Sequence, residues 1–263
     1  MLLALDIGNT NIVIGLFDGH SLVNHWRVAT DERRTADEYA LALQALLAQS
    51  GRTPREISAI VLSSVVPPLT PVIEGLLAKH YVADVLVVGP ETDTGMPLRY
   101  LKPYEIGADR IVNAVAAYHK YGGPLVVVDF GTATTFDAVS ADGAYLGGAI
   151  APGIGISSEA LFQQAARLAR VKLVRPEQAI GQTTEAGLQA GIVFGFAGLV
   201  DELVRRISAE LPTRPRVIAT GGLADLVAGE AATIERVDPL LTLEGLRLIH
   251  ERSRQRSSAG QPG

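Results

Sequence analysis

Runs of apolar residues short enough for β-strands alternate with longer stretches whose apolar residues recur at helical spacing. In the first part of the chain this pattern predicts the order βββαβαβ. Thr35 and Glu38 form a capping box before the first helix, and Thr70 with Pro71 indicates an N-cap and a first helical position for the second. The predicted segments are two strands within residues 3–19, a strand at 21–28, a helix at 35–47, a strand at 57–66, a helix at 70–80 and a strand at 85–88.

The second part of the chain repeats this plan. A loop rich in glycine, proline and threonine at residues 89–104 leads to an alanine-rich helix that opens at Gly107-Ala-Asp-Arg110 and ends at Gly122. Two lobes with the same order of elements predict a cleft between them, where ligands commonly bind. The later predicted segments are three strands from residue 125 through 150, a helix from 157, a long helix from 184 to 211, a strand at 217–220 and further αβα elements.

Two stretches of the chain repeat one another in detail. Leu3–Gly19 reads LALDIGNTNIVIGLFDG and Val126–Gly143 reads VVVDFGTATTFDAVSADG, with the lead aspartates Asp6 and Asp129 standing 123 positions apart. Each stretch is an apolar strand ending in aspartate, a glycine-centred turn with asparagine or threonine, and a second strand closed by Asp-Gly. Such self-similarity indicates a duplicated supersecondary unit.

The glycine-centred turns indicate phosphate binding, because a residue without a side chain lets backbone N–H groups approach an anion closely. An aspartate at the same place repels phosphate unless a cation lies between them, and Mg²⁺ prefers hard oxygen ligands such as carboxylate. Asp6 and Asp129 are therefore predicted to organise a cation. For either copy alone, a plain hairpin with a solvated aspartate is the alternative, and repetition in register favours the phosphate site.

Composition narrows the class of protein. With 263 residues, of which 48% are hydrophobic, the chain has enough material for two lobes of about 120 residues each. A net charge of −5 and scattered basic residues argue against nucleic acid as a partner. The chain has no cysteine, no basic leader and no apolar stretch of about 18 residues. We therefore expect a cytoplasmic protein without disulfides, thiol catalysis or a membrane partner.

Two further segments carry sequence signals. Gly187, Gly191, Gly195 and Gly198 lie on one face of the predicted long helix. Because each helical glycine costs about 1 kcal/mol relative to alanine, close packing against a neighbouring helix or a partner subunit is the expected compensation. The last residues, 251–263, carry three arginines followed by serine, glycine and proline, and they are predicted to be a disordered tail.

Motifs of several common enzyme classes are absent from the sequence, namely G-x-x-x-x-G-K-[ST], G-x-G-x-x-G after a strand and G-x-S-x-G. A P-loop protein, a dinucleotide fold and a serine hydrolase are therefore disfavoured. In Val217-Ile-Ala-Thr-Gly-Gly222 a strand runs into Gly221 and Gly222, where a purine and its ribose can lie against the backbone. Taken alone, this glycine pair is more often a plain turn.

Five motifs occur in a specific order and spacing: Asp6-Ile-Gly-Asn-Thr-Asn11, Gly107-Ala-Asp-Arg110 with Ile-Val-Asn113 after it, Asp129-Phe-Gly-Thr-Ala-Thr134, Gly147-Gly-Ala-Ile-Ala-Pro-Gly153 and Thr220-Gly-Gly-Leu-Ala224. Together they resemble type III pantothenate kinases over residues 1–250. The resemblance implies an α/β fold, the duplicated two-lobed fold of acetate and sugar kinases, Hsp70 and actin, which is ribonuclease H-like. We expect lobes at 1–118 and 119–250, with the active site in the cleft between them.

The resemblance also implies the activity and its ligands. The expected reaction is ATP-dependent phosphorylation of pantothenate to 4′-phosphopantothenate, the first step of coenzyme A biosynthesis, catalysed by a homodimer. The expected cofactors are Mg²⁺ and a monovalent cation, K⁺ or NH₄⁺.

Residue roles are carried over position by position. Asp109 is the candidate base, although an aspartate in the first turn of a helix is also favoured by the helix dipole alone. Arg110 favours an ionised neighbour and can hold a carboxylate by two hydrogen bonds, the alternative being a surface salt bridge. The implied pantothenate contacts are Tyr100, Gly107, Ala108, Asp109, Arg110 and Thr184. The implied nucleotide contacts are Asp6, Ile7, Gly8, Asn9, Thr10, Asn11, Ile12, Val13, Thr132, Gly221 and Gly222, with Asp6 and Asp129 at the cations.

Three alternatives share parts of this pattern. Another kinase or a polyphosphate phosphatase of the same fold would have the hairpins but not Gly107-Ala-Asp-Arg110. A non-catalytic relative could serve as an accessory factor in transcriptional regulation, although Asp6, Asp109 and Asp129 are all present. An ATP-driven switch or filament protein like Hsp70 or actin would need a longer chain.

Overall fold

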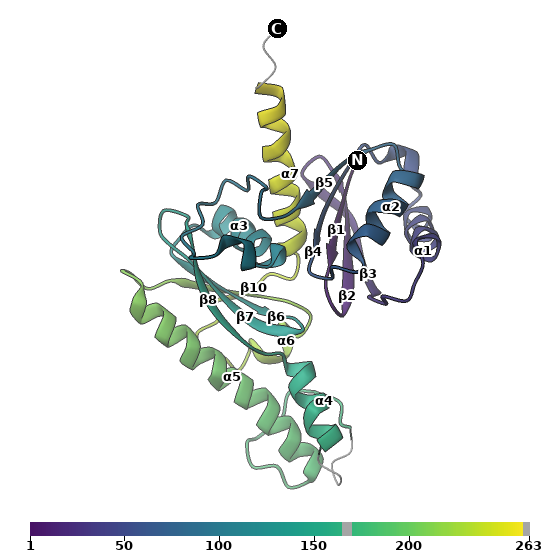
Figure 1. Ribbon diagram of the computed structural model, residues 1–263. Helices are drawn as coiled ribbons and strands as arrows, with labels where there is room; N and C mark the ends of the chain where they lie inside the picture. The colour runs from purple at the N-terminus through teal and green to yellow at the C-terminus, as the bar shows by residue number, and fades with distance from the viewer. Residues whose placement is uncertain (165–169, 260–263) are drawn as a thin grey trace. The chain divides into compact units, whose positions relative to one another are not determined.

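The computed structural model describes residues 1–164 and 170–259, and contacts divide the chain into two compact units (Figure 1). Unit 1 comprises residues 1–95, 102–116 and the chain from Thr242 onward. Unit 2 comprises residues 96–101 and 117–241. We expected one boundary between the lobes, after residue 118. The chain instead crosses between the units several times, because residues 96–101 belong to unit 2 and the C-terminal helix returns to unit 1.

Unit 1 is built on a five-stranded mixed sheet with the order β3-β2-β1-β4-β5. The first three strands form an antiparallel meander, and β4 and β5 run parallel to β1. This is the predicted βββαβαβ order, with the strand expected at 57–66 shorter than predicted. The strands are β1 (Leu2–Ile7), β2 (Asn11–Asp18), β3 (Ser21–Ala29), β4 (Ala59–Ser64) and β5 (Asp84–Val88).

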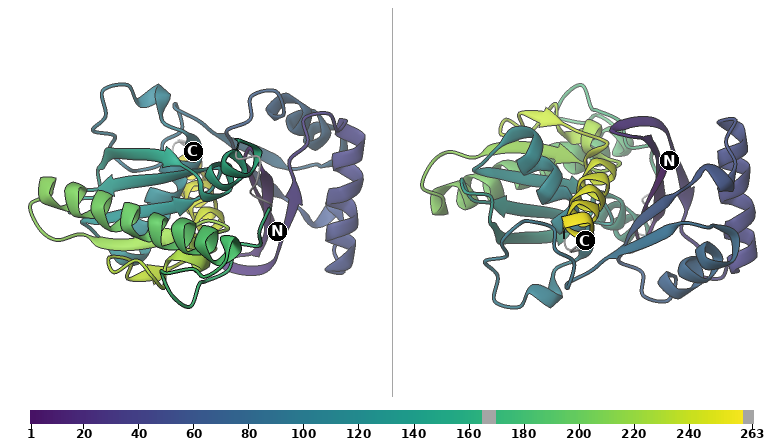
Figure 2. Two further views of the ribbon diagram at one scale, coloured as in Figure 1. Left: turned by 90° about the horizontal axis from the view of Figure 1, so that it is seen from below. Right: turned by 90° about the horizontal axis from the view of Figure 1, so that it is seen from above.

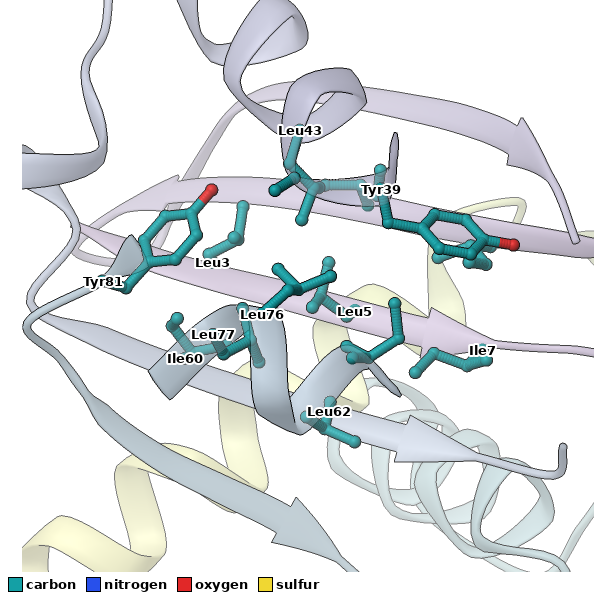
Figure 3. Close-up of a cluster of buried hydrophobic side chains, with 14 of the residues drawn as sticks. Leu3, Leu5, Ile7, Tyr39, Leu43, Ile60, Leu62, Leu76, Leu77 and Tyr81 are labelled. Atoms are coloured by element: carbon teal, nitrogen blue, oxygen red, sulfur yellow. The ribbon is translucent and has the colours of Figure 1, made fainter. Parts of the chain in front are cut away.

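Helices α1 (Ala36–Gln49) and α2 (Thr70–His80) cover one face of this sheet (Figure 1). Figure 3 shows the resulting core, in which β1 and β4 present alternate leucine and isoleucine side chains to the two helices. The capping box at Thr35 and Glu38 is present. Thr70, however, is the first helical residue rather than the N-cap, which is Leu69. The Thr70 hydroxyl instead donates to Ser64 Oγ at 2.7 Å, because Ser64 ends the strand beside it.

Two more helices contribute to unit 1. Helix α3 (Ala108–Tyr121) begins in unit 1, and α7 (Leu241–Ala259) packs against it. A Cβ on Gly245 would lie 2.2 Å from the Val112 carbonyl oxygen, so only glycine permits this approach. The Thr242 hydroxyl donates to Asn113 Oδ1 at 2.7 Å.

The end of the chain differs from the predicted disordered tail. Residues 251–259 continue α7, and residues 260–263 lie outside the described residues. Glu251 pairs with Arg247 one turn earlier at 2.6 Å, and Arg252 and Arg256 both pair with Asp93. Ion pairs with neighbouring turns and with a second segment therefore support a helix that composition alone did not predict.

Unit 2 repeats the topology with a sheet of order β10-β9-β6-β7-β8. β6, β7 and β8 form an antiparallel meander, while β9 and β10 add in parallel. The match with the first sheet confirms the duplicated α/β plan. The strands are β6 (Leu125–Phe130), β7 (Ala133–Val139), β8 (Tyr145–Pro152), β9 (Arg216–Thr220) and β10 (Arg236–Val237).

Helices α4 (Ile154–Gln164), α5 (Thr184–Glu210) and α6 (Ala224–Val227) belong to unit 2. α5 runs along one face of the second sheet, as the left view in Figure 2 shows. Its buried stripe, which includes Ala197, Val200 and Val204, packs against sheet residues such as Val128 and Phe136. Helix α4 begins three residues before the predicted start.

α5 is long and apolar enough to cross a membrane by length and composition alone, so the absence of an uninterrupted apolar stretch of about 18 residues does not by itself exclude a membrane span. Core helices of soluble proteins pass the same test, and α5 has the buried stripe of a core helix.

Candidate active site

The first glycine-centred turn joins β1 to β2 at residues 8–11. The Gly8 N–H donates to the Asn11 carbonyl at 3.0 Å, and the Thr30 hydroxyl donates to the Gly8 carbonyl at 2.6 Å. Asn9 and Thr10 are exposed at the tip. The Ile7 and Ile12 side chains lie in the apolar core, so only their backbone atoms can face a ligand. The turn is therefore a braced loop with exposed polar residues, suited to binding phosphate.

Asp6 ends β1 directly before this turn. Its partner across the parallel pairing with β4 is Ser63, whose hydroxyl donates to Asp6 Oδ1 at 2.7 Å. Burial raises the pKa of Asp6 from 3.8 to about 7, with the Ser63 hydrogen bond acting in the opposite direction and the charge of Asp109 adding to the increase. A carboxylate in this position is charged at lower energetic cost when a cation lies beside it.

Asp109 lies in the first turn of α3, close enough for its charge to affect Asp6. Its carboxylate accepts the Arg110 backbone N–H at 2.8 Å, and a Cβ on Gly107 would lie 2.5 Å from Asp109 Oδ1. Burial raises the pKa of Asp109 above its usual value, while the hydrogen bond and charge of Arg110 oppose this increase. Arg110 thus acts in the predicted direction, but desolvation is the larger effect.

The second glycine-centred turn joins β6 to β7 at residues 131–133, one residue shorter than the first. The Gly131 N–H donates to the Ala133 carbonyl at 3.1 Å. Asp129 ends β6 as Asp6 ends β1, and Thr132 lies in the turn. A Cβ on Gly153 would be 2.1 Å from the Thr132 carbonyl oxygen, which places the start of α4 directly against this loop.

Gly221 follows β9 beside the same turn. Its φ is +95°, and a Cβ there would lie 2.4 Å from Asp129 Oδ1. Any side chain at this position would displace the carboxylate of Asp129, so the packing requires glycine at Gly221. The structure brings Asp129, Thr132 and Gly221 together within unit 2.

Tyr100 and Thr184, the remaining predicted contacts, also lie in unit 2. The Tyr100 side chain is partly exposed and its ring meets that of Tyr145 edge-on, with centroids 6.1 Å apart. Thr184 is the exposed first residue of α5, whose N-cap is Thr183. In unit 1, Gly107 and Ala108 immediately precede Asp109 and Arg110 at the start of α3.

The carboxylate of Asp6 suits a cation that keeps part of its water shell. Within residues 1–164 and 170–259, no group of three or more histidine, cysteine, aspartate or glutamate side chains is arranged as a metal site. Mg²⁺ is commonly bound through one or two carboxylates together with water and substrate phosphates. Asp6, desolvated and next to the first glycine-centred turn, fits that arrangement.

A protein-family model described as type III pantothenate kinase matches residues 2–206 of the chain. The type III pantothenate kinase of Moorella thermoacetica is 57% identical over 253 residues, covering 96% of this chain and 100% of that protein. The corresponding enzyme of Geobacter sulfurreducens is 56% identical, with coverage of 97% and 100%. This chain belongs to the type III pantothenate kinases.

Solved structures of more distant proteins agree on the fold of this type III family member. A Campylobacter jejuni structure assigned to the Baf family of transcriptional activators has a TM-score of 0.61 at 20% identity, covering 96% of this chain and 99% of that one. An inorganic polyphosphate/ATP-glucomannokinase from Arthrobacter has a TM-score of 0.50 at 17% identity, with coverage of 97% and 98%. At these identities the comparison shows the fold alone. It is the fold that the sequence predicted for this chain, the one that sugar kinases share.

The predicted list omitted two residues at these turns. Ser63 contacts Asp6 from a strand 57 positions away, and no local pattern around it indicates that role. Gly153 was part of a matched motif, and its close approach to Thr132 now gives it a physical reason.

Proposed function

We propose that this protein transfers the γ-phosphoryl group of ATP to the 4′-hydroxyl of pantothenate, the first step of coenzyme A biosynthesis. The observation that carries this proposal is the pairing of Asp6, at a phosphate-binding turn, with Asp109, a desolvated carboxylate near it. Family membership supplies the substrate, and the two carboxylates supply the chemistry that phosphoryl transfer requires.

Asp109 is the proposed general base. Phosphoryl transfer requires mainly positioning and charge stabilisation, with a group that accepts the proton of the attacking hydroxyl. A carboxyl whose pKa burial has raised accepts a proton more readily near neutral pH than a solvated one does. The absence of a side chain at Gly107 leaves the space that the Asp109 carboxylate occupies.

Four of the proposed pantothenate contacts lie at the start of α3. Arg110 would bind the carboxylate at one end of pantothenate through parallel hydrogen bonds. Gly107 and Ala108 would offer backbone groups, and Tyr100 and Thr184 would complete the contacts.

The proposed nucleotide contacts are the two turns and the glycine pair after β9. The turn residues Gly8, Asn9, Thr10 and Asn11, together with Thr132, would bind the β- and γ-phosphates, and Gly221 with Gly222 would lie against the adenosine. Asp6 would hold Mg²⁺ and Asp129 a monovalent cation, K⁺ or NH₄⁺. Bound there, these ions would neutralise the charge that develops on the transferred phosphoryl group.

A homodimer and a cytoplasmic location complete the proposal. Gly187, Gly191, Gly195 and Gly198 on α5 are exposed, and a Cβ built at any of them has nothing within 4 Å in the single chain. The helix therefore keeps four glycines on a face without close packing in the chain itself, which supports a second copy as the partner. Sedimentation equilibrium measures the mass, and a mass of one chain at all concentrations contradicts the dimer.

The experiment that tests the activity is ADP release from ATP and Mg²⁺, with pantothenate present or withheld, in K⁺ and then in Na⁺ buffer. We expect release that depends on pantothenate and is stimulated by K⁺, with phosphopantothenate identified by mass spectrometry. No release by folded protein in any of these conditions contradicts the kinase and favours a non-catalytic accessory factor.

A further inference from the structure

A fully buried carboxylate lies outside the residues assigned so far. Asp137 is in the middle of β7 and has no exposed surface. Side chains alternate along a strand, so Asp137 shares a face with Thr135, and Thr135 pairs with Asp129 on β6. The neighbouring Phe136 points to the opposite face, into the core beneath α5. Asp137 therefore belongs to the sheet face that carries Asp129.

Asp137 is held by two hydroxyl groups. The Tyr145 hydroxyl donates to Asp137 Oδ1 at 2.7 Å, and the Thr135 hydroxyl donates to Oδ2 at 3.3 Å. Tyr145 is itself fully buried. A buried carboxylate is destabilising unless it accepts hydrogen bonds, so the Tyr145 hydroxyl is strongly constrained to this partner. The bond fixes the orientation of the Tyr145 ring.

Tyr145 in turn organises the segment that carries Tyr100. Its N–H donates to the Pro97 carbonyl at 2.9 Å, and its carbonyl accepts the Arg99 N–H at 2.9 Å. The Tyr145 ring meets the Tyr100 ring at an interplanar angle of 66°.

Gly147 also lies against the Tyr100 ring. Its φ is +108°, and a Cβ there would lie 3.0 Å from the Tyr100 ring. The Tyr145 ring and Gly147 thus define where the partly exposed Tyr100 side chain can lie.

We propose that Asp137 and Tyr145 are positioning residues that hold Tyr100 in place for pantothenate. This inference rests on the proposed function, in which Tyr100 contacts the substrate. An exposed tyrosine on a loop samples several rotamers, and binding must then offset the entropy of ordering it. The buried pair Asp137–Tyr145 orders the Tyr100 ring before pantothenate binds. Loss of the pair should therefore weaken the affinity for pantothenate and leave nucleotide binding unchanged.

The test is Tyr145→Phe, which keeps the aromatic ring and removes the hydroxyl that Asp137 accepts. We expect KM for pantothenate to rise about three- to tenfold, the range that one aromatic contact supplies, with KM for ATP and kcat within about twofold of the wild type. In a Tyr100→Ala background the same substitution should not raise KM for pantothenate further.

Tyr121→Phe is the matched control. The Tyr121 hydroxyl donates to Asp238, also a largely buried carboxylate in unit 2, at 2.7 Å. This substitution removes an equivalent hydrogen bond and should lower stability while leaving KM for pantothenate unchanged. Equal KM values in Tyr145→Phe and the wild type overturn the positioning role.

Hydrogen exchange separates this inference from the proposed activity. Peptides containing residues 96–101 should exchange faster in Tyr145→Phe than in Tyr121→Phe, whether or not the protein phosphorylates pantothenate. Unchanged exchange overturns the inference about Tyr100. If exchange increases but no variant or wild type releases ADP with pantothenate, the proposed function fails and the ordering of Tyr100 stands.

Discussion

At the scale of single residues, the candidate-site carboxylates of Asp6 and Asp109 lie in different environments. Asp6 is partly exposed at the end of a strand with the Ser63 hydroxyl as a partner, whereas Asp109 lies at a helix start beside Arg110. The charge of Asp109 contributes to the raised pKa of Asp6, and a cation held by Asp6 would favour the ionised carboxylate. Cation binding and the protonation of this pair are therefore coupled.

Asp109→Asn should lower kcat by about 10²- to 10⁴-fold, the usual contribution of a general base, because it removes the proton acceptor and keeps the shape. ATP binding should be preserved, since the turn at residues 8–11 is unchanged. Steady-state ADP release and calorimetric titration with ATP measure the two quantities. Turnover within a factor of two of the wild type would rule out Asp109 as the base.

Asp6 should make the ligand-free protein less stable as pH rises. Its pKa is about 7 in the folded protein against 3.8 for the unfolded chain, so the folded state binds more protons between these values. The stabilisation is complete below pH 4 and is lost through pH 7. The full shift corresponds to about 4 kcal/mol, and the remaining exposure of Asp6 reduces this to about 1–3 kcal/mol.

Urea unfolding at pH 5 and pH 8 measures this effect, with Asp6→Asn as the comparison. The wild type should lose free energy of unfolding between these pH values, and Asp6→Asn, which cannot ionise, should lose less by about 1–3 kcal/mol. The same slope in both proteins would show that Asp6 does not titrate in this range.

At the scale of elements, α5 has two faces with different partners. Valines on one face pack against the second sheet, whereas a Cβ built at any of the four glycines on the other face would meet nothing within 4 Å among the described residues. In a helix without a partner such glycines are destabilising. This cost is the reason that the proposed dimer is tested at the glycine face.

Gly195→Gln should dissociate the proposed dimer and leave each chain folded. The new side chain enters open space in one chain, and glutamine is the better helix former by about 0.5–1 kcal/mol. Gly75→Gln on α2 is the control, because Gly75 is also exposed with nothing near its Cβ position. Sedimentation should give one-chain mass for Gly195→Gln only. Dimers in both variants would exclude the glycine face as the interface.

At the scale of the whole molecule, a ligand that binds only the folded protein stabilises it by mass action. ATP and Mg²⁺ at 100 times Kd should add about 2.7 kcal/mol, which corresponds to about 5–10 °C in Tm for a chain of this size. Asp109→Asn should show the same increase, whereas Gly8→Val, which blocks close approach at the first turn, should lose it. Differential scanning calorimetry without pantothenate measures these shifts, and an equal increase in Gly8→Val would contradict nucleotide binding at that turn.

The duplicated hairpins, the order of helices and strands and the family are all readable in the sequence, because strand periodicity, capping and turn chemistry are local signals. Glycine at Gly8 and Gly131, each with an aspartate two positions earlier, predicts a pair of phosphate turns because the pattern occurs twice in register. Only the tertiary structure placed Ser63 beside Asp6, Gly153 against Thr132, and Tyr145 between Asp137 and Tyr100. These contacts depend on strand register and close packing between segments far apart in sequence, which no local pattern specifies.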